Sequence, residues 1–472
     1  MIGYILKPDM SFGFPGNRKG KFWVVIVAVC AIALMLPACT VLSSPTEYYK
    51  QGNAYYADKK WEEAIEAYTA AISRDSHQAI IFTNRALAYN QLGEYDKAIE
   101  DCNRALTLNP NLTLAYITRA SAYNEKGWYD LAIKDSNRAL ELSPRSALAY
   151  MNRAWAYNAL GKYEEAVSDC NQAIDIEPGR ALAYMNRAWA YNEMGKYDEA
   201  LADCNKTLEL GPTLPLAYVN RAWVYNQTGG YDLAISDCNK AIELDPRTAT
   251  AFVNRAWANM MKGKHDLAIE DCNKAIVLNP NLAFAYTTRA WAYFEKSTYD
   301  TTKDWLDMGM DDCDKAIQLN PNFALAFNQR AYGYILKQIY QLAIVDASKA
   351  ISLNDKFALA YNTRAWAYIN LYQWDLAITD CDKAISLNPK LAQAYDRRAW
   401  CYNAKGMYER ALQDSNQAIK IDYEMAIAYY TRGIIHKNLG QMDKAAADLQ
   451  RCIDLTDSPP LKAAARAVLE TF

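Results

Sequence analysis

The chain has 472 residues, with 51 lysines and arginines against 54 aspartates and glutamates, which gives a net charge of -3. This balance provides no broad positive field for a nucleic acid. A hydrophobic content of 51%, with 35 tyrosines and 12 tryptophans, excludes a disordered chain. The three histidines (His77, His265 and His436) are far apart in sequence, which disfavours a metal site or a base–nucleophile pair.

The N-terminal segment has the layout of a secretory signal. Arg18, Lys19 and Lys21 precede an apolar run at residues 22–36, which is followed by Pro, Ala and then Cys39. The sequence Leu-Pro-Ala-Cys resembles the lipobox of bacterial lipoprotein signals. This resemblance implies that Cys39 is lipidated and becomes the mature N-terminus.

An uncleaved signal anchor and plain secretion are the two alternatives for this segment. The apolar run has fifteen residues, which is short for a helix that must cross ~30 Å of hydrocarbon. We therefore expect residues 1–39 to be a signal peptide, or a signal anchor, and residues 40–44 to be a short tether. Acyl chains or an anchor would hold the rest of the chain at a membrane of the cell envelope, outside the cytoplasm.

The remainder of the chain is repetitive. From Pro45 to Pro459 the sequence repeats every 34 residues, twelve times, with one seven-residue insertion near 300–306. Counted from the start of each repeat, position 4 is Tyr or Phe, position 8 is Ala or Gly, and position 11 is Tyr in ten repeats. The repeats begin at Pro45, Ala79, Thr113, Ala147, Ala181, Pro215, Ala249, Ala283, Ala324, Ala358, Ala392 and Ala426.

The spacing of the apolar positions predicts two helices in each repeat. Positions 4, 7, 8 and 11 have the i, i+3, i+4, i+7 spacing of one helical face, and positions 20, 24, 27 and 28 repeat it. Gly at position 15 in eight repeats breaks the chain between them. Each helical hairpin buries its apolar face only against its neighbours. Residues 460–472 have a helical pattern and are expected to cap the open end.

The same pattern identifies the repeat. A large residue at position 4, small residues at positions 8, 20 and 27, an aromatic residue at position 11 and, in eight repeats, Pro at position 32 resemble the tetratricopeptide repeat. The resemblance covers residues 45–459. It implies an all-α fold, an α–α superhelix or solenoid of about twelve helix-turn-helix repeats, in which the first helix of each repeat lines a concave groove.

Opposite charges recur on the two predicted helices. Position 7 is Arg and position 23 is Asp in every repeat except the first. An unpaired buried charge costs several kcal/mol, so we predict a structural Arg–Asp ladder that holds the two helices of a hairpin together. Ligand binding by these residues is the alternative.

Cysteine occurs at position 24 in seven repeats. Equivalent sites on stacked helices lie at least ~8 Å apart, whereas a disulfide needs Cα atoms within ~7 Å. Other repeats have Ser, Ala, Tyr or Leu at this position, so we predict packing residues in place of disulfides or metal ligands. The seven are Cys102, Cys170, Cys204, Cys238, Cys272, Cys313 and Cys381.

The groove face of the first helix is expected to carry the ligand contacts. At ~100° per residue, positions 2, 5, 6, 9, 12 and 13 point away from the core. Position 9 is Trp in seven repeats, and Asn recurs at positions 6 and 12. An amide offers a donor and an acceptor to a peptide backbone, and an indole ring supplies amphipathic contact area. The asparagines at position 6 also resemble the ladder in the repeats of O-linked N-acetylglucosamine transferases, which grips substrate backbone.

We therefore predict that two rows of side chains bind a protein or peptide ligand. The alternative is that the tryptophans pack against the first helix of the next repeat. The predicted contacts are Asn84, Asn152, Asn186, Asn220, Asn254, Trp155, Trp189, Trp223, Trp257 and Trp291.

The sequence contains no phosphate loop, nucleophile elbow, zinc motif or paired-carboxylate pocket. We therefore predict a non-catalytic, membrane-attached scaffold or adaptor that binds a protein or extended peptide in its groove, without a metal or cofactor and without nucleic acid. A self-assembling structural oligomer and a non-catalytic subunit of an enzyme complex are the alternatives. The insertion in the eighth repeat carries Trp305 and is a further candidate contact.

Overall fold

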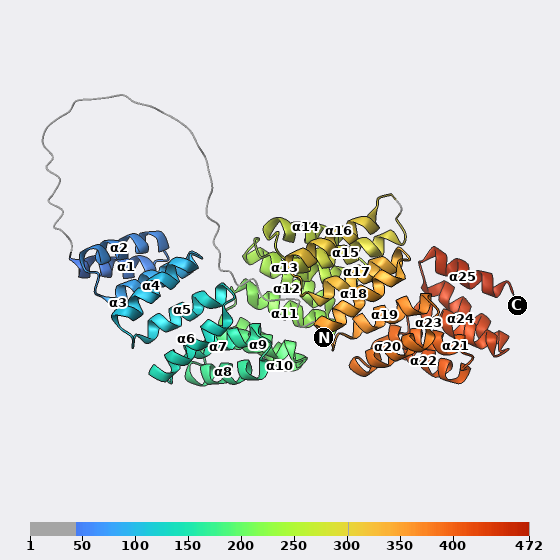
Figure 1. Ribbon diagram of the computed structural model, residues 1–472. Helices are drawn as coiled ribbons and strands as arrows, with labels where there is room; N and C mark the ends of the chain where they lie inside the picture. The colour runs from blue at the N-terminus through green and yellow to red at the C-terminus, as the bar shows by residue number, and fades with distance from the viewer. Residues whose placement is uncertain (1–43, 301, 472) are drawn as a thin grey trace, which may run out of the picture. The chain divides into compact units, whose positions relative to one another are not determined.

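The computed structural model describes residues 44–300 and 302–471. All secondary structure in these two ranges is α-helical (Figure 1), as the sequence predicts. Paired helices follow one another along the chain, which confirms the predicted solenoid of helix-turn-helix repeats. Cys39, the predicted signal peptide and residues 40–43 of the tether lie outside the described residues.

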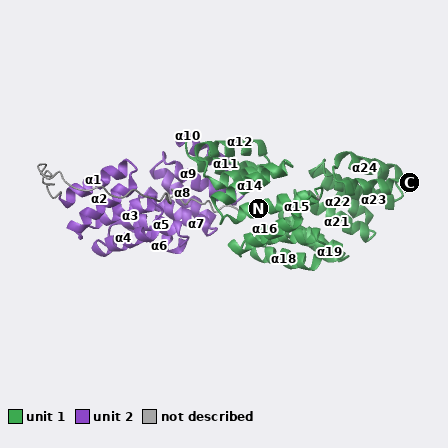
Figure 2. Cartoon of the chain, turned by 90° about the horizontal axis from the view of Figure 1, so that it is seen from above, with its two compact units in different colours: residues 1–7, 213–472 green, residues 8–212 purple. Residues whose placement is uncertain are grey.

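Two compact units divide the chain at residue 212 (purple and green in Figure 2). In the described residues the N-terminal unit has ten helices, and the first helix of each pair begins where a sequence repeat begins. Its helices are α1 Pro45–Ala57, α2 Trp61–Arg74, α3 Ala79–Gln91, α4 Tyr95–Leu108, α5 Thr113–Glu125, α6 Tyr129–Leu142, α7 Ala147–Ala159, α8 Tyr163–Ile176, α9 Ala181–Glu193 and α10 Tyr197–Leu210.

The C-terminal unit continues the same pairing through seven more repeats and ends in α25, which packs against α24 through Leu449, Cys452 and Ala465. Its helices are α11 Pro215–Thr228, α12 Tyr231–Leu244, α13 Ala249–Met261, α14 His265–Leu278, α15 Ala283–Ser297, α16 Trp305–Leu319, α17 Ala324–Leu336, α18 Tyr340–Leu353, α19 Ala358–Asn370, α20 Trp374–Leu387, α21 Ala392–Ala404, α22 Tyr408–Ile421, α23 Ala426–Asn438, α24 Met442–Leu455 and α25 Pro459–Leu469.

A residue in the left-handed conformation at position 15 turns the chain between the helices of a pair. Glycine supplies it in eight repeats, with φ between 69° and 83°, because it has no Cβ to clash there. Lys59, Gln338 and Tyr372 adopt φ near 60° at the same position, which costs a residue with a side chain about 1 kcal/mol. The turn is therefore a property of the repeat and not of glycine alone.

Small residues let the two helices of a repeat approach closely, and position 8 is matched to position 24. In most repeats Ala at position 8 faces Cys, Ser or Ala at position 24. In the first repeat Gly52 lies against Tyr68, and a Cβ on Gly52 would come within 2.5 Å of the Tyr68 ring. In the last repeat Gly433 lies against Leu449, and a Cβ on Gly433 would come within 2.9 Å of the Leu449 side chain. A larger residue at position 24 is thus accommodated because glycine replaces alanine at position 8 opposite it.

The eighth repeat has a large aromatic residue, Phe294, at position 12, and glycines make room for its ring. Phe294 has no exposed surface, and glycines replace alanine where its ring packs, at Gly309 and Gly333. Trp305, from the insertion, is 7% exposed and stacks on Tyr293 with ring centroids 5.5 Å apart. Its indole packs within the repeat and offers little surface to a partner.

The predicted Arg–Asp ladder is confirmed in all eleven repeats. Arg187 shows the geometry: its Nε and Nη2 donate to the two carboxylate oxygens of Asp203 at 2.7 and 2.8 Å. Its Nη1 donates to Asn171 Oδ1 of the preceding repeat at 2.6 Å. Each bidentate pair therefore ties the two helices of one repeat together and also joins that repeat to the one before it.

The cysteines at position 24 are packing residues, as predicted. All seven are at most 1% exposed and carry free thiols. Burial raises the pKa of the Cys170 and Cys272 thiols. In the described ranges we find no group of three or more His, Cys, Asp or Glu side chains placed to hold a metal ion.

Candidate functional site

The first helices of the repeats form the inner face of each unit. In the N-terminal unit α1, α3, α5, α7 and α9 contact one another in succession, and in the C-terminal unit the odd-numbered helices from α11 to α23 do the same. The second helices of the described repeats make no comparable contacts with one another. Helices that converge lie on the narrower side of a stack, so the predicted groove residues lie on its inner face.

The asparagines at position 6 use their side-chain N–H groups to hold neighbouring first helices together. Asn152, Asn186 and Asn254 donate to a backbone carbonyl at position 5 of the preceding repeat. Asn84 donates to the Tyr49 hydroxyl and to Asn53 Oδ1. The backbone bonds are Asn152 to Ile117 at 2.9 Å, Asn186 to Met151 at 3.4 Å and Asn254 to Val219 at 3.2 Å.

The predicted ligand contacts at position 6 require a correction for two residues. Asn254 has no exposed surface and Asn186 is 5% exposed, because the close approach of successive first helices covers them. These two amides join repeats and do not present themselves to a ligand. Asn84, Asn152 and Asn220 keep part of their surface, and for them ligand contact stays a prediction.

The asparagines at position 12 form a second row of bonds in the opposite direction. Four of them, Asn90, Asn124, Asn158 and Asn226, donate to the backbone carbonyl at position 6 of the following repeat, so carbonyls inside one first helix accept side-chain bonds from the first helix before it. The sequence analysis placed these amides in the groove and did not predict that they join neighbouring repeats. The constant spacing between positions 12 and 6 was the feature of the sequence that could have indicated it. The bonds are Asn90 to Thr118 at 3.0 Å, Asn124 to Asn152 and Asn158 to Asn186 at 2.8 Å, and Asn226 to Asn254 at 2.9 Å.

The tryptophans at position 9 differ in how far they are buried. In the C-terminal unit Trp223 and Trp257 are 5% and 9% exposed, and their rings lie 6.0 and 5.8 Å from that of Phe284 on α15. Trp257 thus packs against the first helix of the next repeat, as in the packing alternative, and Trp223 packs against the first helix two repeats further on. Ligand contact at these two residues stays a prediction. In the N-terminal unit Trp155 and Trp189 remain partly exposed on the inner face.

A polar and aromatic cluster lies further along the inner face of the C-terminal unit. The Glu295 carboxylate accepts from Trp291 Nε1 at 3.1 Å and from the Tyr332 hydroxyl at 3.2 Å. The Tyr332 ring lies 5.8 Å from that of Trp366. Trp291, a predicted ligand contact that is partly exposed, is therefore tied to Glu295. This places a carboxylate and two hydrogen-bond donors together on first helices.

Arg397 extends this cluster and was not singled out from the sequence. Arg397 stands at position 6, where the other repeats after the first have Asn, Thr or Gln. This unusual residue type is the feature of the sequence that could have marked it as a candidate. Its guanidinium lies 4.8 Å from the centroid of the Trp366 ring and forms no ion pair with a carboxylate of the described residues. Its buried Nη1 has no hydrogen-bond partner in the same ranges. Burial lowers the pKa of Arg397 and raises that of Asp396 to about 6.

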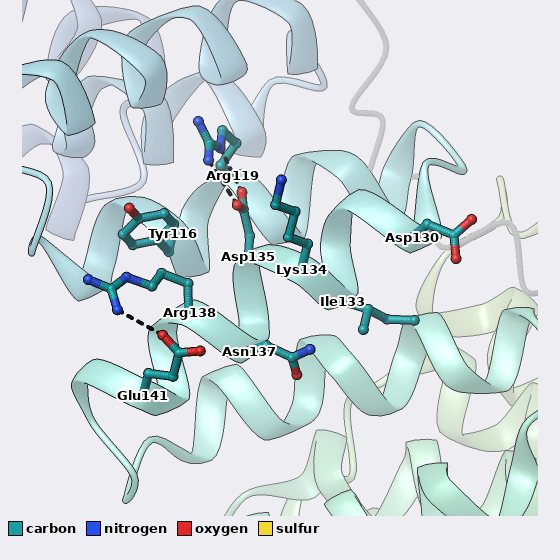
Figure 3. Close-up of a pocket in the computed structure, with 9 residues that line it drawn as sticks. All are labelled: Tyr116, Arg119, Asp130, Ile133, Lys134, Asp135, Asn137, Arg138 and Glu141. Carbon is teal, nitrogen blue, oxygen red and sulfur yellow. Dashed lines mark hydrogen bonds and ion pairs between the residues drawn. The ribbon is translucent and has the colours of Figure 1, made fainter.

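A hollow of about 640 Å³ lies on α5 and α6 in the N-terminal unit (Figure 3). Its lining is mostly charged, and the charges are largely paired within the repeat. Arg138 pairs with Glu141 at 2.7 Å, and Arg119 belongs to the ladder through Asp135. The hollow lacks the predominantly apolar lining of small-molecule sites. It therefore adds no second candidate to the inner face.

Comparison with protein families agrees with the repeat geometry, and the matches together cover more than half of the chain. Models described as tetratricopeptide repeat match residues 79–112, 147–180, 181–214 and 249–282, 358–391, 381–413, and 114–146, 216–248 and 426–458. A model described as TPR repeat matches residues 52–93. The chain belongs to the tetratricopeptide repeat family.

Individual relatives share only short stretches with this chain. A DnaJ homolog subfamily C member 7 homolog of Schizosaccharomyces pombe is 54% identical over 46 residues, which are 9% of this chain and 10% of the relative. The translocon at the outer membrane of chloroplasts 64 of Pisum sativum is 46% identical over 46 residues, 10% of this chain and 8% of that protein. The chain thus matches about a tenth of the length of these curated relatives.

One solved structure confirms the fold. The Cut9 and Hcn1 hetero-tetramer of APC/C matches with a TM-score of 0.54 at 14% identity, over 91% of this chain and 96% of that one. A tetratricopeptide repeat protein of Parabacteroides merdae matches with a TM-score of 0.44 at 22% identity, over 52% of this chain and 98% of the other. Within the described residues, no helix has both the length and the apolar character needed to cross a bilayer.

Proposed function

We propose that this chain is a non-catalytic scaffold that binds an extended segment of a partner protein along the inner face of its repeats. One observation carries the proposal: Trp155 and Trp189 keep exposed surface on first helices that contact one another in succession. The amides beside them hold the helices together and so fix the spacing of the rings. A rigid row of aromatic groups suits recognition of a polypeptide, because such rings bury large area at low entropic cost.

Membership of the tetratricopeptide repeat family supports a role in protein–protein interaction. The inner face of the C-terminal unit adds a chemical preference. Arg397 lies over Trp366 and keeps part of its surface exposed, which suits a carboxylate of the partner, since guanidinium–carboxylate bonds are strong in a partly desolvated site. We therefore propose that the partner segment carries acidic residues where it meets this cluster.

Membrane attachment through Cys39 is a separate part of the proposal and rests on the lipobox-like sequence alone. It would place the scaffold in the cell envelope. Replacing Cys39 with Ala tests it: the variant should leave the membrane fraction on cell fractionation. If the variant stays with the membranes, attachment by lipidation is excluded.

Partner binding is tested by affinity capture from detergent-solubilised membranes. The full chain is compared with a variant carrying Trp155→Ala and Trp189→Ala and with a control carrying Trp128→Ala. Trp128 is 44% exposed, in the turn before α6 and away from the inner face. We expect one protein to be captured by the wild type and the control and lost from the double variant. Equal capture by all three chains would exclude the inner face as the binding surface.

A further inference from the structure

The outer helices of the C-terminal unit carry a row of exposed aliphatic side chains. In five successive repeats position 19, in the first turn of the second helix, is Leu or Met, allowing for the insertion in the eighth repeat. Their exposed fractions lie between 37% for Met308 and 55% for Leu233. We call these residues the leucine row: Leu233, Leu267, Met308, Leu342 and Leu376.

The row is specific to this part of the chain. Elsewhere the same position is charged in every repeat but one, as expected for a solvated outer face. Single exposed leucines are common on protein surfaces, but five in consecutive repeats form a continuous feature that needs an explanation. The equivalent residues are Glu63, Lys97, Leu131, Glu165 and Glu199 in the N-terminal unit, and Arg410 and Lys444 at the other end of the row.

Adjoining side chains enlarge the apolar surface. Val345 lies one turn after Leu342 on α18 and is 61% exposed, and Ile339 and Tyr372 are exposed just before α18 and α20. If a fully exposed side chain of this size presents roughly 150 Å², the row and these neighbours present roughly 600 Å² of surface. A homodimer interface of about 800 Å² per partner, about 65% apolar, needs roughly the same apolar area.

Charged groups beside the row do not oppose contact with another surface of the same kind. The aspartates next to the row at position 18 are held by lysines from the following repeat, so each carboxylate is paired within its own chain. These ion pairs are Lys262 with Asp232, Lys296 with Asp266, Lys337 with Asp307, and Lys405 with Asp375.

We propose that the leucine row is the surface through which two copies of this chain associate. Its members are one repeat apart, so their spacing is that of the repeat itself. A second copy presents the same residues at the same spacing, so a two-fold arrangement can pair the row with itself. The row lies on second helices, whereas the proposed partner site lies on first helices. The inference therefore stands independently of the proposed function.

The test is sedimentation velocity of the full chain in one detergent, over a hundredfold range of protein concentration. The test variant carries Leu267→Glu and Leu342→Glu, and the matched control carries Leu131→Glu. Glutamate occupies this position naturally in two repeats, at Glu165 and Glu199, so all variants should fold, which circular dichroism checks. We expect wild type and control to dimerise, and dimerisation of the double variant to be at least ~100-fold weaker because like charges then face each other.

Raising the salt concentration separates this contact from an electrostatic one, because an apolar interface persists in high salt. A wild-type chain that stays monomeric at every concentration overturns the proposal, even if the row then proves to bind anionic lipid vesicles. Equal dimerisation of the wild type and the double variant also overturns it, since self-association would then use another surface.

Discussion

Replacing Asp203 with alanine removes one rung of the Arg–Asp ladder. In the native chain both carboxylate oxygens of Asp203 accept from Arg187, and the Asp203 side chain is only 7% exposed. The substitution leaves the Arg187 guanidinium with Asn171 as its remaining partner. Breaking a buried ion pair costs about 3–5 kcal/mol. Because the Arg187 side chain is 20% exposed and keeps some access to water, we expect the low end, ~3 kcal/mol.

The assay is urea unfolding followed by circular dichroism, with amide hydrogen exchange to locate the loss, since arrays of repeats lose structure locally. We expect faster exchange in α9 and α10. Asp96→Ala is the control: Asp96 pairs with Lys126 of the next repeat but is 81% exposed, so its loss should change stability by less than ~1 kcal/mol. A change for Asp203→Ala as small as that of the control would refute the buried ladder.

Three further predictions concern local packing and chemistry. Gln338 has φ 60°, a conformation that glycine adopts without strain, so Gln338→Gly should stabilise the chain by ~0.5–1 kcal/mol. Gly406 has φ 73°, so Gly406→Ala should destabilise the chain by a similar amount. Urea unfolding measures both changes. Gly309→Ala should lower stability by ~1–3 kcal/mol because its Cβ would come within 2.5 Å of the Phe294 ring; an unchanged melting temperature would contradict this. Burial raises the pKa of Cys401 to about 12, so iodoacetamide at pH 8 should alkylate it only after denaturation; mass spectrometry of the native chain checks this.

The periodic features of the fold were predictable from the sequence because each repeat supplies an independent copy of the same signal. The two helices, the left-handed turn at glycine, the Arg–Asp ladder and the buried cysteines all follow from spacing within one repeat. Non-glycine turns such as Gln338 were missed, since only position in the repeat, and not residue type, marks them.

The candidate site was harder to predict because it depends on contacts between repeats. Trp223 packs against Phe284, two repeats further along the chain, and this contact depends on how tightly the inner face curves. Nothing within one repeat shows that curvature. The asparagines were assigned to the correct face, but the close approach of first helices turned their N–H groups toward neighbouring carbonyls.

Site-specific photocrosslinking in intact cells tests the central claim most directly. A photoreactive phenylalanine analogue is placed at Trp155 or Trp189 on the inner face, and at Trp128 as the exposed control, and the crosslinked protein is identified by mass spectrometry. We predict that the two inner-face positions capture the same protein and that Trp128 captures little of it. Capture of that protein mainly at Trp128, or no capture at the inner-face positions, would contradict the account of the inner face as a protein-binding surface.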